Sequence, residues 1–248
     1  SSGHHESIRF ILSLYPETER SQAMCDQDKS KRTVLHHAVS TNSHESLKAV
    51  LALSQETERL QAVRMQDKGG QTALHSAANF GRVECIKILV SVYPESERSL
   101  TANIKDKDGK TVLHCAACSG NPEAIRLILA LYSEEERLQA VMETCNLGML
   151  HCAARTGNLE SIETILSVFP ESERLRALNT TTHNGATVLH SVAVSDNIEC
   201  LKAVLSLYPE SQRIHALNKR IAFGQSVLHN MKAPNRSSIL EWLFTDVG

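Results

Sequence analysis

The sequence of 248 residues predicts an all-α solenoid, in which short helices stack repeat upon repeat. Three observations predict this fold class. One six-residue motif recurs at a nearly constant spacing, an amphipathic helical pattern follows most copies, and a turn-rich segment leads from one copy to the next. Because one short amphipathic helix pair cannot bury its apolar face alone, each repeat must pack against its neighbours.

The motif reads TVLHHA at residue 33, TALHSA at 72, TVLHCA at 111, GMLHCA at 148, TVLHSV at 187 and SVLHNM at 226. Successive copies begin 39 residues apart, except that 37 residues separate the third from the fourth. A residue needed once for chemistry has no reason to recur in every repeat, so we expect the histidine of each copy to build the fold. The six histidines are His36, His75, His114, His151, His190 and His229.

Each motif is predicted to open a short first helix, whose small residues, such as Ala116 and Ala117, allow close packing. Six residues after each histidine stands a glycine, an asparagine or an aspartate. These residue types tolerate the left-handed backbone that ends a helix. They are Asn42, Gly81, Gly120, Gly157, Asp196 and Asn235.

A second helix is predicted where apolar residues follow at i, i+3 and i+4, as at Ile125, Ile128 and Leu129. A short third helix is predicted from segments such as PESER at 94–98, because proline suits the first turn of a helix. A glutamate three residues before an arginine allows an ion pair on that helix. The expected pairs are Glu95–Arg98, Glu134–Arg137, Glu171–Arg174 and Glu210–Arg213.

The T-x-L-H-x-A-A motif, the left-handed residue after it, the I-x-x-[IV]-L second helix and a D-x-x-G-x-T turn together resemble the ankyrin repeat. Valine or alanine stands where family members typically have proline, as at Val34 and Ala73. The repeat is also roughly six residues longer than usual, and the third helix accounts for the excess. Such long repeats are similar to those of ankyrin-repeat effector proteins of intracellular bacterial pathogens. The resemblance implies stacked helix pairs with turn or hairpin fingers between them.

We expect one solenoid over 1–248, because the motif positions recur in phase throughout. The segment at 2–12 aligns with that at 119–129, so the chain is expected to start inside a repeat and to be part of a larger protein. The expected boundaries are a partial repeat at 1–28, repeats at about 29–67, 68–106, 107–143, 144–182 and 183–221, and a terminal partial repeat at 222–248.

The composition excludes several classes of function. A net charge of −2 gives no field that would attract nucleic acid or an anionic membrane, and 4% aromatic residues argue against base-stacking platforms. No apolar stretch is long enough to span a membrane. The irregular spacing of seven cysteines predicts reduced thiols in an intracellular, reducing compartment. That compartment is the cytoplasm, or the host-cell cytoplasm if the protein is a secreted effector.

His114, Cys115 and Cys118 share one helix face by spacing, a pattern that could indicate a metal site or a reactive thiolate. No fourth ligand and no general base is evident nearby. The histidines of successive repeats are expected about 10 Å apart, whereas zinc ligands lie about 2.0–2.3 Å from the ion. We therefore expect no metal, no cofactor and no catalytic residue. Cys115, Cys118 and Cys152 are expected on the exposed side of the first helix.

The recurring arginines at 20, 59, 98, 137, 174 and 213 could form a phosphate-binding ridge or a solvated, acid-paired edge. The paired edge is favoured, because each arginine recurs and has an acidic neighbour.

In ankyrin-like repeats, the positions that differ from one repeat to the next are the turn before the threonine and the exposed residues one, four and five after the histidine. These positions distinguish one repeat protein from another and are the candidates for partner contacts. Aromatic residues and arginine dominate interface hot spots. The alternative is that the residues at these positions are ordinary surface residues. The candidate partner-binding residues are Lys68, Phe80, Lys107, Lys110, Cys118, Leu147, Arg155 and Phe223.

The sequence thus predicts a non-catalytic module that binds another protein through its concave face, as a monomeric array. It predicts no binding to nucleic acid or membrane. The alternative is a substrate-recruiting or regulatory domain of a larger enzyme whose catalytic domain lies outside this sequence.

Overall fold

The computed structural model describes residue 16 and residues 22–143 and 148–245. The chain divides into two compact units. The N-terminal unit comprises Ser1–Ser119 and Glu123–Glu136, and the C-terminal unit comprises Gly120–Pro122 and Arg137–Gly248. The described residues of both units form helices, turns and two isolated β-bridges, and none of them lies in an extended strand.

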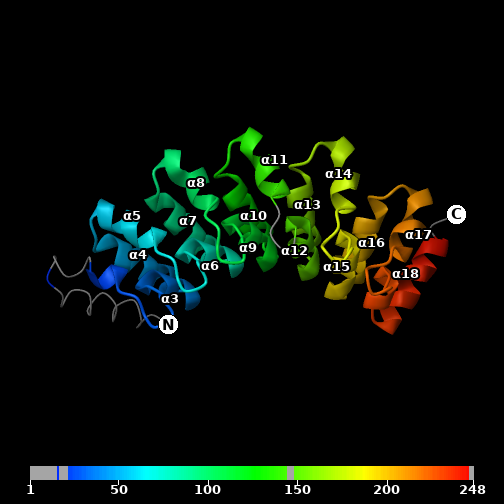
Figure 1. Cartoon of the computed structure of the whole chain (residues 1–248), viewed down its shortest axis with the longest axis horizontal. Helices are drawn as coiled ribbons and strands as arrows, with labels where there is room; N and C mark the ends of the chain where they lie inside the picture. Colours follow the sequence, from blue (N-terminus) through cyan, green and yellow to red (C-terminus); the bar gives the residue numbers. More distant parts are fainter. Residues whose placement is uncertain (1–15, 17–21, 144–147, 246–248) are drawn as a thin grey trace. The chain divides into compact units, whose positions relative to one another are not determined.

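The predicted three helices per repeat are confirmed (Figure 1). The first helices are α3 (Val34–Ser40), α6 (Ala73–Asn79), α9 (Val112–Ser119), α12 (Met149–Thr156) and α15 (Val188–Ser195). The second helices are α4 (His44–Ala52), α7 (Val83–Val92), α10 (Pro122–Leu129), α13 (Leu159–Leu166) and α16 (Ile198–Ser206). The third helices are α5 (Glu56–Arg64), α8 (Arg98–Ala102) with the preceding 3-10 turn η1 (Glu95–Glu97), α11 (Glu134–Met142), α14 (Glu171–Leu178) and α17 (Glu210–Asn218).

Like helices stack on like helices within each unit. In the N-terminal unit α3 packs on α6, α6 packs on α9, and α4 packs on α7. In the C-terminal unit α12 packs on α15 and α13 packs on α16. The apolar stripe of the second helices fills the space between repeats, and Leu47, Ile86 and Ile162 are fully buried. Each such side chain contributes roughly 1.5–3 kcal/mol of burial free energy.

The motif histidine makes hydrogen bonds through both nitrogens of its imidazole ring in the first two repeats. Its Nδ1 accepts hydrogen bonds from the backbone N–H and the hydroxyl of the threonine three residues earlier, at 3.2 and 2.9 Å for His75 and Thr72. In His36, His75 and His151 the Nε2–H donates to a backbone carbonyl of the following repeat, whereas His190 Nε2 is buried without a hydrogen-bond partner. His36 reaches Gln71 O at 3.0 Å, and His75 reaches Ile104 O at 2.9 Å. These contacts give the histidines the structural role that their recurrence predicts.

The predicted left-handed residues after the first helix are confirmed at five positions. Asn42, Gly81, Gly120, Gly157 and Asp196 have φ between 55° and 71°. Asn235 was expected in the same role, and this prediction is wrong.

The last repeat replaces the first helix by a short 3-10 turn, η2 (Val227–Asn230), and Asn235 lies inside the helix α18 (Ala233–Thr245). The Asn235 side chain instead donates to the Asp196 carbonyl and carboxylate.

The third helix is fastened by arginines and tyrosines rather than by the expected glutamate–arginine pairs. The Nε–H groups of Arg98, Arg174 and Arg213 donate to the backbone carbonyl five residues earlier, at 3.3–3.4 Å. Within the described part of the chain no ion pair joins these arginines to Glu95, Glu171 or Glu210. The guanidinium folds back over the connecting loop, where a buried carbonyl is a better partner than an exposed carboxylate.

Tyrosine hydroxyls join the third helices of neighbouring repeats. Tyr93, which directly follows α7, donates to Val63 O near the end of α5 at 2.8 Å. Tyr208 makes the equivalent bond to Leu178 O at 3.2 Å in the C-terminal unit. Both tyrosines are 2% exposed, and burial raises the pKa of each hydroxyl, so the hydroxyl remains a donor at neutral pH.

The fourth repeat departs from this pattern, because Gly148 occupies the threonine position. Its backbone angles, φ −58° and ψ 152°, are those of the extended residue before a helix, so the shape of the chain is retained without the hydroxyl. His151 still donates from Nε2 to Ala186 O at 3.0 Å. Its Nδ1 is buried and has no hydrogen-bond partner.

Acid should destabilise this fold below the ordinary histidine pKa. Burial lowers the pKa of His36, His75 and His190 from 6.5, so the unfolded chain binds protons more readily than the folded one. The stability is fully present above pH 6.5 and is lost as the pH falls below it. Urea unfolding across this range should therefore show a falling free energy of unfolding. His75→Gln should flatten that dependence, whereas His215→Gln at an exposed site should not; equal slopes in the two variants would contradict the explanation.

Gly148→Thr should raise the free energy of unfolding by about 1 kcal/mol, because a hydroxyl would satisfy His151 Nδ1 and the unfolded chain would lose glycine's freedom. Gly148→Val is the matched control, since it has the same branched shape without the hydroxyl. Chemical denaturation should rank threonine above valine. A valine variant as stable as the threonine variant would show that the hydroxyl contributes nothing.

Candidate functional site

Five-residue turns connect the third helix of one repeat to the first helix of the next, and we call them fingers. They comprise residues 28–32, 67–71 and 106–110 in the N-terminal unit and 182–186 and 221–225 in the C-terminal unit. In each finger the first N–H donates to the last carbonyl, as from Asp67 to Gln71 O at 2.9 Å. The fourth residue is left-handed, a role taken by glycine in four fingers and by Lys31, with φ 58°, in the first. The fingers are therefore tight and internally bonded.

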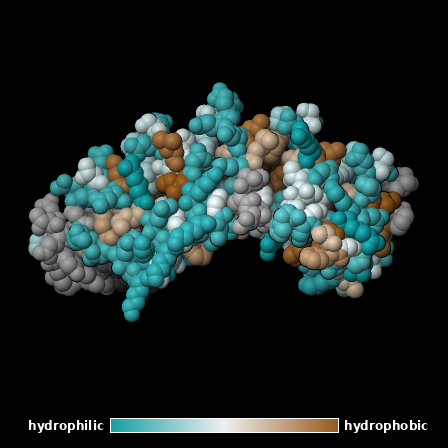
Figure 2. All heavy atoms as spheres, viewed as in Figure 1, coloured by the Kyte–Doolittle hydropathy of each residue, from teal (hydrophilic) through white to brown (hydrophobic). Residues whose placement is uncertain are grey.

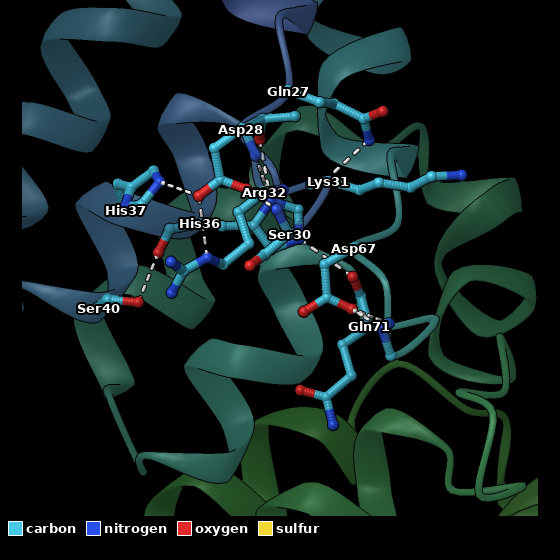
Figure 3. Close-up of polar contacts among 12 residues, drawn as sticks. Gln27, Asp28, Ser30, Lys31, Arg32, His36, His37, Ser40, Asp67 and Gln71 are labelled. Atoms are coloured by element: carbon cyan, nitrogen blue, oxygen red, sulfur yellow. Dashed lines mark hydrogen bonds and ion pairs between the residues drawn. The ribbon is translucent and has the colours of Figure 1, made fainter.

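The aspartates that begin the first three fingers direct their carboxylates into the turn (Figure 3 shows the first of them). Asp67 Oδ1 accepts from the N–H of Gly69 and of Gln71 at 2.7 and 3.0 Å. Asp106 Oδ1 accepts in the same way from Asp108 and Lys110, both at 2.9 Å. These carboxylates stabilise the turn itself.

The first finger adds side-chain partners to this pattern (Figure 3). Asp28 accepts from the N–H groups of Ser30 and Arg32, from Arg32 Nε at 3.2 Å, and from His37 at 3.1 Å. The backbone N–H of Arg32 makes the largest contribution to lowering the pKa of Asp28 to about 2. The carboxylate is thus ionised at neutral pH and fully engaged in the turn.

Neighbouring fingers are joined by backbone hydrogen bonds. Lys68 N–H donates to Ser30 O and Lys107 N–H donates to Gly69 O, both at 2.9 Å. Ala222 N–H donates to Asn184 O in the C-terminal unit, also at 2.9 Å. The tips of successive fingers therefore form one connected edge within each unit.

The side chains at this edge in the N-terminal unit are basic. Lys29, Lys31, Lys68 and Lys107 are exposed, and no described residue forms an ion pair with Lys68 or Lys107. The sequence showed aspartates beside lysines and so a modest local charge. The structure separates most of them: the carboxylates of Asp28, Asp67 and Asp106 are bonded inside the turns, whereas these lysines and Asp108 are exposed.

The structure places the other candidate residues as follows. Phe80 is 54% exposed at the end of α6, and the Arg82 guanidinium lies 4.7 Å from its ring centroid. Arg155 is exposed at the end of α12, and Phe223 is 82% exposed at a fingertip. Lys110 and Cys118 are half-buried. Leu147 lies outside the described residues.

The candidates fall in different units. Lys68, Phe80, Lys107, Lys110 and Cys118 belong to the N-terminal unit, and Arg155 and Phe223 belong to the C-terminal unit. Figure 2 shows a largely hydrophilic surface on which hydrophobic residues form small, separate patches. Each unit therefore presents its own basic or apolar contact residues.

The expected exposure of the cysteines is wrong at two positions. Cys115 and Cys152, directly after the histidine, are 1% and 2% exposed. Among the five first helices, the residue directly after the histidine is exposed only at His37, whereas the residues four and five after it are exposed or half-buried in every one. Val194, four residues after its histidine and 57% exposed, meets that rule and was overlooked because it is a small apolar residue.

The described residues hold no group of three or more histidine, cysteine, aspartate or glutamate side chains that could bind a metal ion. Burial raises the pKa of the thiols of Cys85 and Cys200, the latter to about 11, so these two are not activated thiolates. None of the helices that the structure describes is both long enough and apolar enough to cross a membrane.

Comparison with known proteins identifies the repeat. The family model described as ankyrin repeats in three copies matches residues 57–140 and 97–173. Among matching solved structures is the ankyrin repeat domain of Bcl-3, a member of the IkappaB protein family, with a TM-score of 0.60 and 17% identity. The match covers 97% of this chain and 94% of that one. No curated protein sequence is similar enough to be counted as a relative. Residues 57–173 therefore match the ankyrin-repeat family model, and the chain has the ankyrin-repeat solenoid fold.

Removing one finger carboxylate should weaken the fold. Asp67→Ala leaves two backbone N–H groups without their acceptor and should lower the free energy of unfolding by about 1–2 kcal/mol. Asp67→Asn keeps an acceptor oxygen in the same place and should cost much less. Denaturant unfolding of both variants measures the difference, and an asparagine variant as unstable as the alanine variant would mean that charge, not the turn bonds, is what matters.

Proposed function

We propose that this ankyrin-repeat array binds another protein through its fingers and the exposed ends of its first helices, the concave face of ankyrin-type arrays. The observation that carries the proposal is that acidic side chains of the fingers bond inside the turns, whereas basic side chains of the same fingers are exposed. The carboxylates of Asp28, Asp67 and Asp106 accept hydrogen bonds within their turns and backbone groups join neighbouring turns, while Lys68 and Lys107 are exposed. A rigid edge that presents charged tips is suited to contact a second surface.

Phe80 supplies the apolar anchor beside this edge. Its ring is more than half exposed and is held by Arg82, so little side-chain entropy is lost on binding. Aromatic residues and arginines of this kind carry most of the energy of protein interfaces. A standard interface needs about 800 Å² per partner, so several adjacent repeats must contribute.

The basic fingertips favour an acidic partner in the N-terminal unit. Exposed lysines at the edge of an interface accelerate encounter and make association sensitive to salt. We place the protein in a reducing compartment, the cytoplasm, because its seven cysteines are irregularly spaced and the six that the structure describes are free thiols. If the protein is a bacterial effector, that compartment is the host-cell cytoplasm. The array is proposed to act as a monomer.

The alternative role, recruitment of a substrate to a larger enzyme or regulation of that enzyme, would use the same surface. It differs in the identity of the bound protein. Affinity capture with the wild-type chain and with a Phe80→Ala chain as the reference, followed by mass spectrometry, identifies proteins that depend on this face.

For a partner identified in this way, Phe80→Ala should weaken binding by about 1–3 kcal/mol while the fold remains intact. Leu100→Ala is the matched control, because Leu100 is 68% exposed on α8, a third helix away from the fingers. Calorimetric titration measures the affinity of each variant for the partner. If Leu100→Ala abolishes binding and Phe80→Ala does not, the third helices form the interface.

Charge should act mainly on the rate of association. Lys68→Glu and Lys107→Glu should each slow association and reduce its dependence on salt, because each removes an exposed cation from the edge. Lys48→Glu on α4 reverses a charge of the same kind off that edge and should leave the rate nearly unchanged. Stopped-flow or surface-binding kinetics at two salt concentrations would test this, and equal effects of all three variants would indicate a general charge effect only.

A further inference from the structure

The three fingers of the N-terminal unit carry a lysine at the same place. Lys29, Lys68 and Lys107 are each the second residue of their finger, directly after the aspartate that bonds inside the turn. All three are exposed, and within the described part of the chain none of them forms an ion pair. The second residues of the C-terminal fingers are His183 and Ala222. The N-terminal unit therefore carries one such lysine per repeat, and we call these three residues the lysine row.

Backbone hydrogen bonds fix the spacing of the lysine row. Lys68 N–H donates to Ser30 O and Lys107 N–H donates to Gly69 O, both at 2.9 Å, so equivalent atoms join each pair of neighbouring fingers. Because Ser30 and Gly69 directly follow the lysine of the preceding finger, covalent geometry allows at most about 11 Å between the Cα atoms of successive lysines. The first helices that follow these fingers stack on one another, at a distance of about 8–10 Å. The row thus offers one cation about every 8–11 Å.

This spacing matches the repeat of a polyproline II segment. Three residues of polyproline II make one turn with a rise of about 3.1 Å each, so every third side chain returns to the same face after about 9 Å. A β-strand directs side chains three residues apart to opposite faces. An α-helix that spans three fingers would need about 15 residues, a length that is marginal in water. A proline-rich segment is already in its binding conformation and loses little entropy when it docks.

We propose that the lysine row binds an extended acidic segment of a partner protein, with aspartate or glutamate at every third position and proline between them. Each carboxylate pairs with the lysine of one finger. The prolines hold the segment in polyproline II, because the residue before a proline is pushed towards extended backbone angles. This inference rests on the proposed function, since it names the chemistry of the partner at the same edge.

Asp108 limits the contribution of the third finger. It directly follows Lys107 and is exposed, whereas the equivalent residues of the first two fingers, Ser30 and Gly69, carry no charge. An exposed carboxylate at this place repels an acidic segment. We therefore expect Lys107 to contribute less than Lys68, and we expect removal of the Asp108 carboxylate to strengthen binding.

The test is a titration of the whole chain with a peptide of three Glu-Pro-Pro repeats with blocked ends, followed by nuclear magnetic resonance of the backbone amides. Saturable shifts are expected at Lys29, Lys68 and Lys107, and affinity should fall as salt is added. The matched control peptide has three adjacent glutamates followed by six prolines. It should bind roughly fivefold more weakly, because its carboxylates cannot meet three fingers at once. Equal binding of the two peptides would overturn the proposal.

Three variants locate the interaction. Lys68→Gln should weaken binding of the Glu-Pro-Pro peptide about two- to fivefold, the contribution of one exposed ion pair. Lys48→Gln on α4 removes a lysine away from the fingers and should leave the affinity unchanged. Asp108→Asn should strengthen binding about twofold. Far-ultraviolet circular dichroism checks the fold of each variant. Equal effects of Lys68→Gln and Lys48→Gln, or no gain in Asp108→Asn, would show a general charge effect and refute the lysine row.

Two comparisons separate this inference from its competitors. A thymidine tetranucleotide carries three negative charges, as the peptide does, and tighter binding of it to the same amides would overturn the acidic segment in favour of nucleic acid. Phe80 lies at the opposite end of α6 from the second finger, so Phe80→Ala should bind the peptide as the wild-type chain does. Capture of a partner that depends on Phe80, together with failure of the Glu-Pro-Pro peptide to bind at millimolar concentration, would refute this inference and leave the proposed function standing.

Discussion

The hydrogen bonds of the motif histidine connect the start of the first helix to the following repeat. One ring nitrogen accepts from the threonine that begins the first helix, and the other donates to a carbonyl of the following repeat. A single buried side chain thus fixes the start of a helix and its distance from the next finger. Because burial keeps the ring neutral, one nitrogen is always a donor and the other an acceptor. Stacking of the first helices, closure of the fingers and the position of the exposed tips all follow from this arrangement.

The fingers show how a surface can be rigid and charged at once. An aspartate carboxylate can accept hydrogen bonds from two backbone N–H groups of its own turn, as at Asp67. The negative charge of the carboxylate therefore lies inside the turn. Lysines on the same turn remain at the tip. A short segment with equal numbers of acidic and basic residues therefore presents mainly its basic groups to the outside. Net charge per segment conceals this separation, whereas the hydrogen bonds reveal it.

The sequence predicts most of the fold because its determinants are local. Left-handed residues, the motif threonine and the apolar triplets act within a few residues, and the described repeats obey them except the fourth, where Gly148 replaces the threonine, and the last. The arginines were misassigned, because their partners are backbone carbonyls that no sequence pattern displays. The burial of Cys115 and Cys152 depends on the adjacent helix and not on the cysteines themselves. In the fourth repeat Gly148 replaces the threonine, and only coordinates show that His151 Nδ1 is left buried without a hydrogen-bond partner.

The acceptors of the histidine bonds are main-chain oxygens, and they belong to three different residues, Gln71, Ile104 and Ala186. Every amino acid carries such an oxygen, so one repeat makes no demand on the identity of its neighbour's side chain at this junction. The tyrosine bonds to Val63 and Leu178 have the same property. Duplicating, deleting or exchanging a whole repeat would consequently require no compensating substitution at these bonds. An array built in this way can change its length and its surface by recombination of complete modules, because these junction bonds end on backbone atoms that every module carries.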